Sequence, residues 1–303
     1  NGPSAGASKL CIDKWATSEF IRKIKLEGIE AIPGTITKTK QILGFSQKKL
    51  EKYWHDLQGM ALPAARRETP EQGCRIFLRA SLLFSSFIVK PRGDGCSTGI
   101  ARLASLPDLA LYLKFLKQGT QVIPANTLKN QNAMIEMPPT GPEYILFEKF
   151  IETDELCVKG AKLIHRPKTG WIEITVGIIE HNNKLHALNP SLTVAQGEVL
   201  TVEEKFQGGT GVNITPPPSI IVAPQILAKI KTRLEQVARL LGIQGYCRID
   251  AFVQAKTGQL KIIEINTLPG LTPSTVFFHQ GLAENQPIYP RELLEKLIEN
   301  KGY

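Results

Sequence analysis

The chain has 303 residues, of which 42% are hydrophobic and 21% are charged. This length and composition are typical of a globular protein with about two domains and room for a sizeable core. The longest apolar stretch, residues 81–89, is too short to span a bilayer, so we expect no membrane partner. The net charge of +9 is spread along the chain without a nucleic-acid-binding motif. We therefore expect no nucleic-acid partner, and attribute the charge to attraction of an anionic nucleotide.

The five cysteines are scattered, and none belongs to a C-x-x-C pair or to a Cys/His set with the spacing of zinc ligands. This pattern argues for a reducing compartment and against a zinc site. Because the first residue is Asn1 rather than Met, we expect the chain to be a fragment or a processed form.

Hydrophobic periodicity and capping residues predict the secondary structure in chain order. Helices are expected over residues 13–26, 46–58, 105–117, 225–241 and 291–299. Strands are expected over residues 86–90, 99–103, 144–150, 171–180, 185–188, 247–254 and 260–266. Because strands and helices are mixed without a regular βαβ period, we predict an α+β architecture with antiparallel sheets.

The expected strands 247–254 and 260–266 form a hairpin, since the five residues between them include a glycine. Side chains alternate between the two faces of a strand, so Arg248, Asp250 and Phe252 share one face of the first strand. On the second strand, the same alternation groups Ile262, Glu264 and Asn266. Closing the hairpin symmetrically gives three opposed pairs: Arg248 with Asn266, Asp250 with Glu264, and Gln254 with Leu260.

Two carboxylates that face each other across strands repel unless a cation lies between them. Asp250, Glu264 and Asn266 together offer oxygen ligands of the kind that Mg²⁺ prefers when it bridges substrate phosphates. Arg248 beside them could hold an anion. The alternative is a half-exposed hairpin whose polar side chains are solvated, which explains the opposed pair of like charges less well.

Residues 90–99 form a second candidate site, a glycine-rich loop between two expected strands. Its glycines allow the backbone to approach a ligand closely. Backbone N–H groups, with the hydroxyls of Ser97 and Thr98, could cradle phosphates, and Lys90 would add a positive charge. The loop is not a Walker A motif, which needs GK[ST] at the start of a helix. A plain hairpin turn remains the alternative.

Together these segments resemble the ATP-grasp enzymes, and specifically the D-alanine–D-alanine ligase family. R-I-D…E-I-N-T-L-P-G-L-T-P (248–273) is similar to the family's R-x-D…E-x-N-T-x-P-G-x-T signature. V-K-P…G-C-S-T-G (89–99) resembles V-K-P-x-x-x-G-S-S-x-G, and A-S…I-D-K (7–14) resembles A-S-x-x-x-M-D-K. F-E-K-F-I (147–151) resembles the adenine hinge, and E-K-F (204–206) the mobile closing loop. The motifs occur in the family's order and cover nearly the whole chain.

The resemblance implies the ATP-grasp fold, with two α+β subdomains clasping ATP between antiparallel sheets. The expected domains are a central subdomain over residues 1–150, with the glycine loop and the adenine hinge, and a C-terminal subdomain over residues 151–303, with the closing loop and the metal site. The implied enzyme is an ATP-dependent carboxylate–amine ligase that forms ADP and phosphate. It would join two D-alanines through an acyl phosphate for peptidoglycan synthesis, with ATP and two Mg²⁺ or Mn²⁺ ions as cofactors.

The resemblance also implies residue roles. The expected metal ligands are Asp250, Glu264 and Asn266. The expected ATP-binding residues are Lys14, Lys90, Gly95, Ser97, Thr98, Glu148, Lys149, Phe150, Ile151, Glu155 and Lys205. The expected catalytic residues are Arg248, Lys205, Ser97 and Cys96, with Arg248 stabilising charge on the acyl phosphate and Lys205 reaching the γ-phosphate. The expected substrate-binding residues are Phe206, Arg248, Gly270, Ser274 and Thr275.

The sequence departs from the family pattern in several places. The N-terminal substrate domain that normally precedes the A-S-x-x-x-M-D-K segment is expected to be missing, so the chain alone should be impaired or inactive. Cys96 replaces the first serine of the loop, and Phe206 replaces the usual tyrosine of the closing loop. Relatives with Phe at that place tend toward D-lactate as acceptor. Residues 40–80 and 157–200 are longer than the family norm and are read as surface insertions.

Three alternatives therefore stand beside the D-alanine ligase reaction. One is a D-alanine–D-lactate ligase, and another is an ATP-grasp carboxylate–amine ligase with a different substrate. The third is a non-catalytic nucleotide-binding half of a tandem protein. The expected partners are the small-molecule substrates, with a homodimer as a further option. The expected location is the cytoplasm, or alternatively a plastid stroma.

Overall fold

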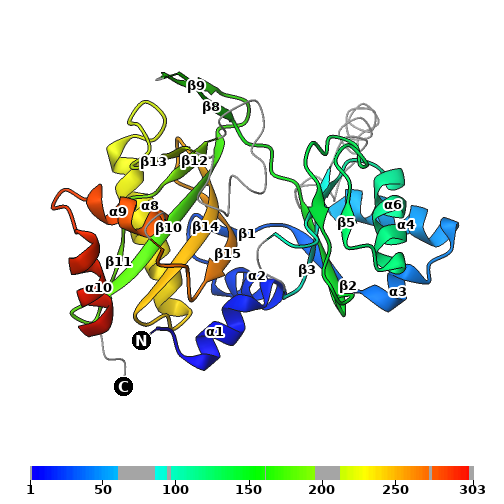
Figure 1. Ribbon diagram of the computed structural model, residues 1–303, viewed down its shortest axis with the longest axis horizontal. Helices are drawn as coiled ribbons and strands as arrows, with labels where there is room; N and C mark the ends of the chain where they lie inside the picture. Colours follow the sequence, from blue (N-terminus) through cyan, green and yellow to red (C-terminus); the bar gives the residue numbers. More distant parts are fainter. Residues whose placement is uncertain are drawn as a thin grey trace. The chain divides into compact units, whose positions relative to one another are not determined.

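The computed structural model describes residues 2–60, 86–93, 97–160, 162–194, 212–272 and 275–299 and divides the chain into two compact units (Figure 1). Unit 1 comprises Asn1–Ala31 and Ile151–Tyr303, and unit 2 comprises Ile32–Phe150. The expected continuous domain over residues 1–150 is therefore corrected, because its first 31 residues pack with the C-terminal half. A strand near residue 30 pairs there with one near residue 260, and local sequence patterns carry no signal of so distant a pairing.

Unit 1 is built on a five-stranded sheet. The strand order is β1 (Ile29–Ala31), β15 (Leu260–Asn266), β14 (Tyr246–Gln254), β10 (Trp171–His181) and β11 (Lys184–Ala187). The pair β1–β15 is parallel, and the other neighbours are antiparallel. With helices packed on an otherwise antiparallel sheet, the α+β class predicted from the sequence is confirmed.

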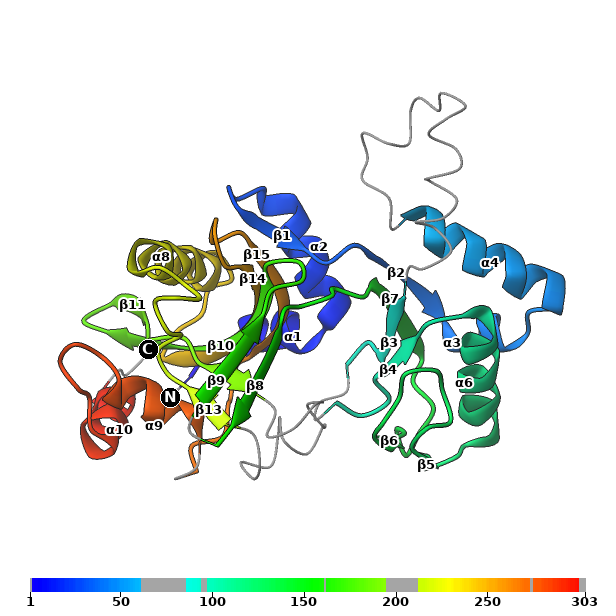
Figure 2. The same cartoon turned by 90° about the horizontal axis from the view of Figure 1, so that it is seen from above.

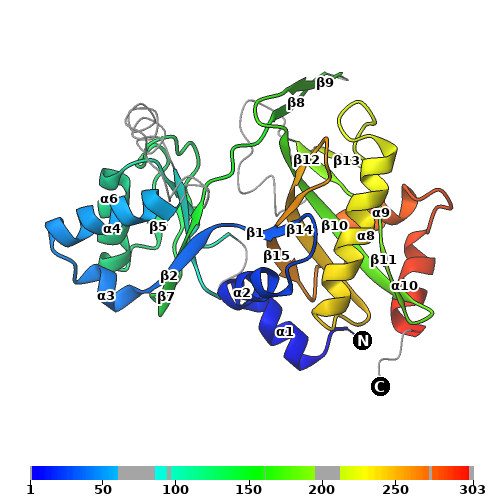
Figure 3. The ribbon, with the colours of Figure 1, turned by 180° about the vertical axis from the view of Figure 1, so that it is seen from behind.

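Three helices cover one face of this sheet: α1 (Ala5–Ile12), α2 (Lys14–Ile24) and α8 (Pro224–Leu240) (Figure 3). Helix α8 starts at a proline and ends before Gly242, which has a φ of 68°, as its sequence predicts. Its buried stripe includes Ile230, Leu234 and Val237. Each such side chain contributes about 1.5–3 kcal/mol on burial, more than helix propensity differences, so packing against the sheet decides where the helix lies. Within the described residues, no helix has both the length and the apolar character needed to cross a membrane.

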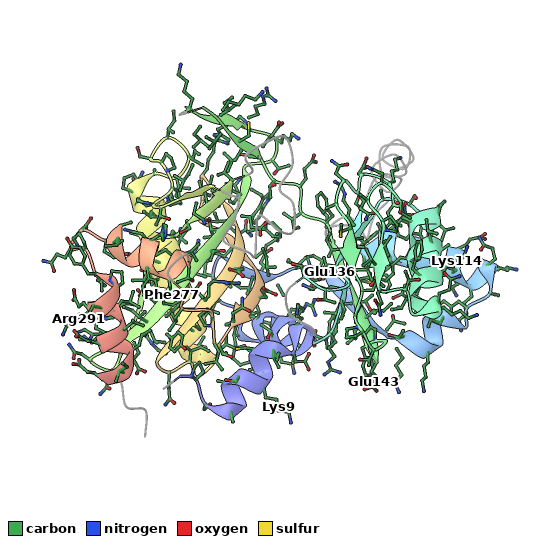
Figure 4. The ribbon with its side chains drawn as sticks, viewed as in Figure 1. Lys9, Lys114, Glu136, Glu143, Phe277 and Arg291 are labelled. Atoms are coloured by element: carbon green, nitrogen blue, oxygen red, sulfur yellow. The ribbon has the colours of Figure 1, made fainter. Side chains whose placement is uncertain are left out.

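The opposite face of the sheet carries α9 (Val276–Leu282) and α10 (Pro290–Glu299) (Figure 2). They form a smaller apolar cluster with Ile179 of β10, in which Phe277, labelled in Figure 4, is fully buried. The ring of Phe277 meets that of Tyr246 edge to face, with centroids 6.1 Å apart. These helices pack near Ile179, and the same face of the sheet also carries Glu173 and Thr175 of β10 and Arg248 and Asp250 of β14.

A hairpin of β8 (Glu155–Lys159) and β9 (Lys162–Arg166) is fastened to unit 1 through the buried carboxylate of Asp154. Its Oδ1 accepts hydrogen bonds of 2.7–2.9 Å from the backbone amides of residues 168–170, and its Oδ2 lies 2.9 Å from His165 Nε2. Burial tends to raise the pKa of Asp154, but the hydrogen bonds from His165 and the three amides lower it more. The pKa therefore lies below its ordinary value of 3.8.

Unit 2 is a four-stranded antiparallel sheet with helices on it. The strand order is β2 (Gly34–Lys38), β7 (Tyr144–Lys149), β3 (Phe87–Pro91) and β4 (Ala101–Leu103). The helices are α3 (Thr39–Leu43), α4 (Gln47–Met60) and α6 (Leu106–Gln118), with a short pair formed by β5 (Val122–Ile123) and β6 (Ile135–Glu136). Ser105 caps α6 by accepting from the Asp108 amide at 3.4 Å, as its capping box predicts.

Candidate active site

The hairpin of β14 and β15 lies at the centre of unit 1 and opposes the two carboxylates as predicted. Asp250 pairs with Glu264, and Arg248 pairs with Asn266. Beyond Asp250 the register shifts, so that Val253 rather than Gln254 faces Leu260. The predicted pairing of Gln254 with Leu260 is therefore wrong, because a β-bulge places one extra residue in β15.

The same bulge changes the side-chain alternation of β15. Ile262 was expected beside Glu264 and Asn266, but it lies in the core together with Leu260 and Ile265. A bulge shifts the alternation of faces by one residue, so apolar side chains on both sides of it can reach the core while Glu264 stays on the other face. The bulge thus leaves Glu264 on the polar face while Ile262 and Ile265, on either side of it, both reach the core.

Asp250 is the best-connected carboxylate of this corner and is 8% exposed. Arg248 binds both of its oxygens, with Nε 3.1 Å from Oδ1 and Nη2 2.9 Å from Oδ2. The Thr175 hydroxyl donates to Oδ1 at 2.8 Å, and Asn266 Nδ2 donates to Oδ2 at 3.2 Å. A carboxylate held from several directions has a fixed orientation, as a catalytic or metal-binding group requires.

Glu264 faces the same corner. Asn266 Nδ2 lies 3.3 Å from its Oε1, and Lys14 Nζ lies 4.0 Å from its Oε2. Lys14 is the first residue of α2, where Asp13 caps the helix by accepting from the Ala16 amide at 3.0 Å. The start of α2 therefore brings a lysine to the carboxylate pair.

This corner fits a divalent cation with phosphates. The side chains of Asp250 and Glu264 are balanced by those of Arg248 and Lys14, so added cations would need anionic ligands of their own, such as phosphates. Asn266 directs its amide nitrogen at both carboxylates, and rotation of that amide would present its oxygen to a cation instead. In the described parts of the chain, no three His, Cys, Asp or Glu side chains gather as a metal site. The trio here combines two carboxylates with an amide.

Strand β10 adds residues that the sequence reasoning missed. Thr175 pairs with Asp250 and Glu173 pairs with Phe252, so both lie on the face that carries the polar corner. The alternation of polar residues along the expected strand 171–180 was the available signal. That alternation could not be connected to this site from the sequence alone, because the register of β10 against β14 was not known.

Unit 2 contributes an ion pair that is almost completely buried. Lys90 of β3 is 3% exposed, Glu148 of β7 is 7% exposed, and Lys90 Nζ lies 2.7 Å from Glu148 Oε2. Glu148 was expected beside adenine, and in the structure its carboxylate neutralises the lysine that was expected to contact phosphates. Gly34 on the neighbouring strand leaves room for this carboxylate, since a Cβ there would lie 2.9 Å from Glu148 Cγ.

The described end of the glycine-rich loop is firmly held. Gly99 has a φ of 68°, and a Cβ there would lie 3.0–3.1 Å from Pro91 and Pro138. Its N–H donates to the Glu136 carbonyl at 2.7 Å, and its carbonyl accepts from the Tyr112 hydroxyl at 2.8 Å. Ser97 and Thr98, expected at the phosphates, lie directly before this anchored glycine.

The remaining expected site residues have separate settings. Glu155 begins β8, where its carboxylate lies 3.0 Å from Arg166 and 3.8 Å from Lys168. Gly270 is exposed, and Thr275 precedes α9. Lys149 and Phe150 lie at the end of unit 2, and Ile151 begins the second part of unit 1. Gly95, Cys96, Lys205, Phe206 and Ser274 lie outside the described residues.

Cys247 stands next to Arg248, but its thiol points into the core. Burial raises the pKa of Cys247 well above 9.0, and the nearby Cys11 and Asp250 raise it further. Burial also raises the pKa of Cys11 to about 11. Neither thiol is a nucleophile at neutral pH, because only the thiolate reacts readily. The chemistry of this corner is therefore that of its carboxylates, arginine and lysine.

Comparison with solved structures defines the class of protein. The D-alanine–D-alanine ligase of Bacillus anthracis complexed with ATP superposes with a TM-score of 0.56 at 16% identity, covering 99% of this chain and 68% of that one. D-alanyl-alanine synthetase A of Vibrio cholerae gives a TM-score of 0.62 at 16% identity, with the same coverage. The chain therefore has the ATP-grasp fold, as predicted.

Sequence comparison then indicates the family. Residues 163–299 match the family model described as D-ala D-ala ligase C-terminus. D-alanine–D-alanine ligase of Oleidesulfovibrio alaskensis is 29% identical over 131 residues, which are 43% of this chain and 40% of that protein. The ligase of Azobacteroides pseudotrichonymphae is 24% identical over 213 residues, 70% of this chain and 52% of that protein. Residues 163–299 are therefore similar to the C-terminal domain of D-alanine–D-alanine ligases, the family that the sequence resembles, and the chain spans about half or less of these relatives.

Proposed function

We propose that this chain is the ATP-using portion of a ligase that joins two D-alanines for peptidoglycan synthesis. The observation that carries the proposal is the opposed pair of Asp250 and Glu264, with Arg248, Asn266 and Lys14 around it, inside the unit that matches the family's C-terminal domain. ATP and two Mg²⁺ ions are the proposed cofactors, and Mn²⁺ is expected to substitute.

The proposed reaction has two steps that balance in atoms and charge. A carboxylate oxygen of the first D-alanine bonds to the γ-phosphorus of ATP, and the bond from that phosphorus to the β–γ bridging oxygen breaks to release ADP. The amine nitrogen of the second D-alanine then bonds to the acyl carbon, and the bond from that carbon to the phosphate oxygen breaks to release inorganic phosphate. The amine loses a proton, which the released phosphate can accept. Both steps build negative charge on oxygen, which positioned cations stabilise.

The residues have distinct proposed roles. Asp250, Glu264 and Asn266 would hold the divalent cations, which supply charge neutralisation at the phosphates when bound. Arg248 is held in place by both oxygens of Asp250, and its positive charge would stabilise the charge that builds on the acyl phosphate. Lys14 would contact phosphate at the corner itself.

Unit 2 and the segment after β15 carry the other proposed contacts. Lys90, Ser97 and Thr98 would bind phosphate, and residues 148–151 would line the adenine pocket. Gly270, which follows β15, would contact the second substrate, and Ser274 or Thr275 would receive the carboxylate of that substrate.

The test compares the parent chain with Glu264→Gln and with the control Glu295→Gln. The control makes the same charge change on the surface of α10, where Glu295 pairs with Arg291. Calorimetric titration with Mg²⁺ and ATP should show at least tenfold weaker binding for Glu264→Gln and an unchanged affinity for the control. Equal Mg²⁺-dependent affinity in all three proteins would show that the carboxylate pair is not the metal site.

Product analysis then tests the substrate. ADP formation is measured with D-alanine, D-lactate and D-serine in turn, and the products are identified by mass spectrometry. D-alanyl-D-alanine is the expected product, while a depsipeptide would support the D-lactate alternative that Phe206 suggests. Tight Mg²⁺–ATP binding without ADP formation in the complete encoded protein would favour the nucleotide-binding module and overturn the ligase assignment.

A further inference from the structure

Gln280 of α9 is a fully buried polar side chain that the proposed chemistry does not use. Its Oε1 accepts from the Gly177 N–H at 2.7 Å, and its Nε2 donates to the Thr175 carbonyl at 2.8 Å and to Ser191 Oγ at 3.0 Å. A buried amide is tolerated when such hydrogen bonds replace those with water. Gln280 therefore binds two residues of β10 and one residue beyond β11.

The Gln280 side chain replaces a backbone partner of β10, because the chain that pairs with β10 on the β11 side is interrupted between Leu188 and Ser191. The Gly177 carbonyl accepts from Leu188, and Thr175 exchanges two backbone hydrogen bonds with Ser191. Asn189 and Pro190 lie between these two contacts, and the Gln280 side chain serves the Gly177 N–H there. Glycine at 177 permits the approach, since a Cβ there would lie 2.8 Å from Gln280 Oε1.

The same short segment of β10 holds a proposed cation ligand. Thr175 pairs with Asp250 in the sheet, and its hydroxyl donates to Asp250 Oδ1 at 2.8 Å. Gln280 thus donates a hydrogen bond to the backbone carbonyl of Thr175, and the Thr175 hydroxyl donates one to the Asp250 carboxylate. A chain of two hydrogen bonds runs from α9 to Asp250.

Helix α9 also directly follows, in the chain, the segment that we assign to the second substrate. The helix begins at Val276, and this segment runs from Gly270 to Thr275. Gln280 therefore anchors the helix that ends this segment to the strand that orients Asp250.

We propose that Gln280 is a positioning residue, which acts through Thr175 to orient Asp250 for a divalent cation. The proposal rests on the proposed function, because it assumes that Asp250 is a cation ligand. Hydrogen-bond partners of metal ligands typically contribute 10–100-fold to metal affinity. Gln280 is one residue further from the cation than Thr175, so its effect should be at the lower end of that range.

The experiment measures Mn²⁺ binding in the presence of a non-hydrolysable ATP analogue, using the electron paramagnetic resonance signal of free Mn²⁺. Gln280→Met nearly preserves volume and removes all three hydrogen bonds, so it should weaken Mn²⁺ binding about tenfold. Gln280→Glu keeps the acceptor for the Gly177 N–H, but its carboxylate has no hydrogen to donate to the Thr175 carbonyl or to Ser191. It therefore breaks the chain to Asp250 as the Met variant does and should also weaken Mn²⁺ binding about tenfold, and it replaces the Met variant if that protein does not fold.

Two variants of Thr175 test whether Gln280 acts on Asp250 through the Thr175 side chain. Thr175→Val should weaken Mn²⁺ binding at least as much as Gln280→Met, and Thr175→Ser should restore it because the serine hydroxyl can still donate to Asp250. The double variant Gln280→Met/Thr175→Val should bind like Thr175→Val alone, since both changes cut one chain of hydrogen bonds. Leu293→Ala, a cavity in the α9–α10 cluster, controls for a general loss of stability.

Amide hydrogen exchange, which needs no metal, provides the second readout. Gln280→Met should speed exchange at Gly177, whereas Thr175→Val should leave that amide protected. Parental Mn²⁺ affinity in Gln280→Met, or losses that add in the double variant, would overturn the role of Gln280. An equal loss in Leu293→Ala would do the same. Absence of Mn²⁺ binding by the parent chain would instead refute the proposed cation site, so the two failures are distinguishable.

Discussion

The buried pair of Lys90 and Glu148 offers a sharp test of how unit 2 is stabilised. At 2.7 Å and an effective dielectric constant near 20, their Coulomb attraction is about 6 kcal/mol, and desolvation offsets much of it. Breaking a buried pair from one side costs about 3–5 kcal/mol, because the other charge is left uncompensated. Glu148→Leu should therefore lower the free energy of unfolding of unit 2 by about 3–5 kcal/mol.

Two further variants separate charge from hydrogen bonding. Glu148→Gln keeps an oxygen that can accept from Lys90, so it should cost about 2 kcal/mol. Lys90→Met/Glu148→Leu removes both charges together and should lie within about 1 kcal/mol of the parent. The loss of unfolding free energy should therefore be largest for Glu148→Leu, smaller for Glu148→Gln and smallest for the double variant. This order follows from the burial of the ion pair and would not be expected for an exposed pair.

Urea titration with tryptophan fluorescence is the assay. Trp54 is buried in the core of unit 2 against Phe87, and its signal is isolated by replacing Trp15 and Trp171 of unit 1 with phenylalanine. A cost below about 1 kcal/mol for Glu148→Leu, or a double variant as unstable as the single one, would refute the reasoning.

Three other outcomes follow from the structure. Asp154→Asn should lower the free energy of unfolding of unit 1 by about 2 kcal/mol at pH 7. Because folding lowers the pKa of Asp154, the difference in urea midpoint between this variant and the parent should shrink as the pH falls below 3.8. Cys11 and Cys247 should resist alkylation at pH 8 in the native chain, since a pKa of about 11 leaves about one thiol in a thousand ionised; rapid labelling of either, read by peptide mass mapping, would contradict their burial. Gly177→Ala should lower the free energy of unfolding of unit 1 by about 1–3 kcal/mol, and an unchanged urea midpoint for unit 1 would count against the close contact. Gly141→Ala, in unit 2, should leave the midpoint of its own unit unchanged, because a Cβ there meets nothing within 4 Å.

Local patterns in the sequence were enough to predict the elements that have strong caps or apolar stripes. Helix α8 carries an apolar residue on every turn of one face, and β15 is bounded as expected at Leu260 and Asn266. The pairing of Asp250 with Glu264 was also predicted, although the register next to the turn was wrong by one residue. The bulge in β15 offsets that error, so the predicted pairing is found at Asp250.

Features that depend on distant contacts were beyond such patterns. Helix α1 has only eight residues and includes a glycine and a serine, so its sequence gives a weak helical signal, and the helix is fixed by packing on the sheet. The bulge in β15 shows only when the register is known. Thr175 and Gln280 act through hydrogen bonds between segments 105 residues apart, so neither belongs to a recognisable motif.

The discontinuity of unit 1 has a consequence for biosynthesis. Glu30 of β1 bonds to Lys261, which the ribosome adds 231 positions later. Unit 2 is one uninterrupted segment, so its sheet can close while the rest of the polypeptide is still being translated. Helices α1 and α2 are translated before β14 and β15, so their apolar sides stay unburied until those strands are made, and the nascent polypeptide is prone to aggregate through them in the meantime.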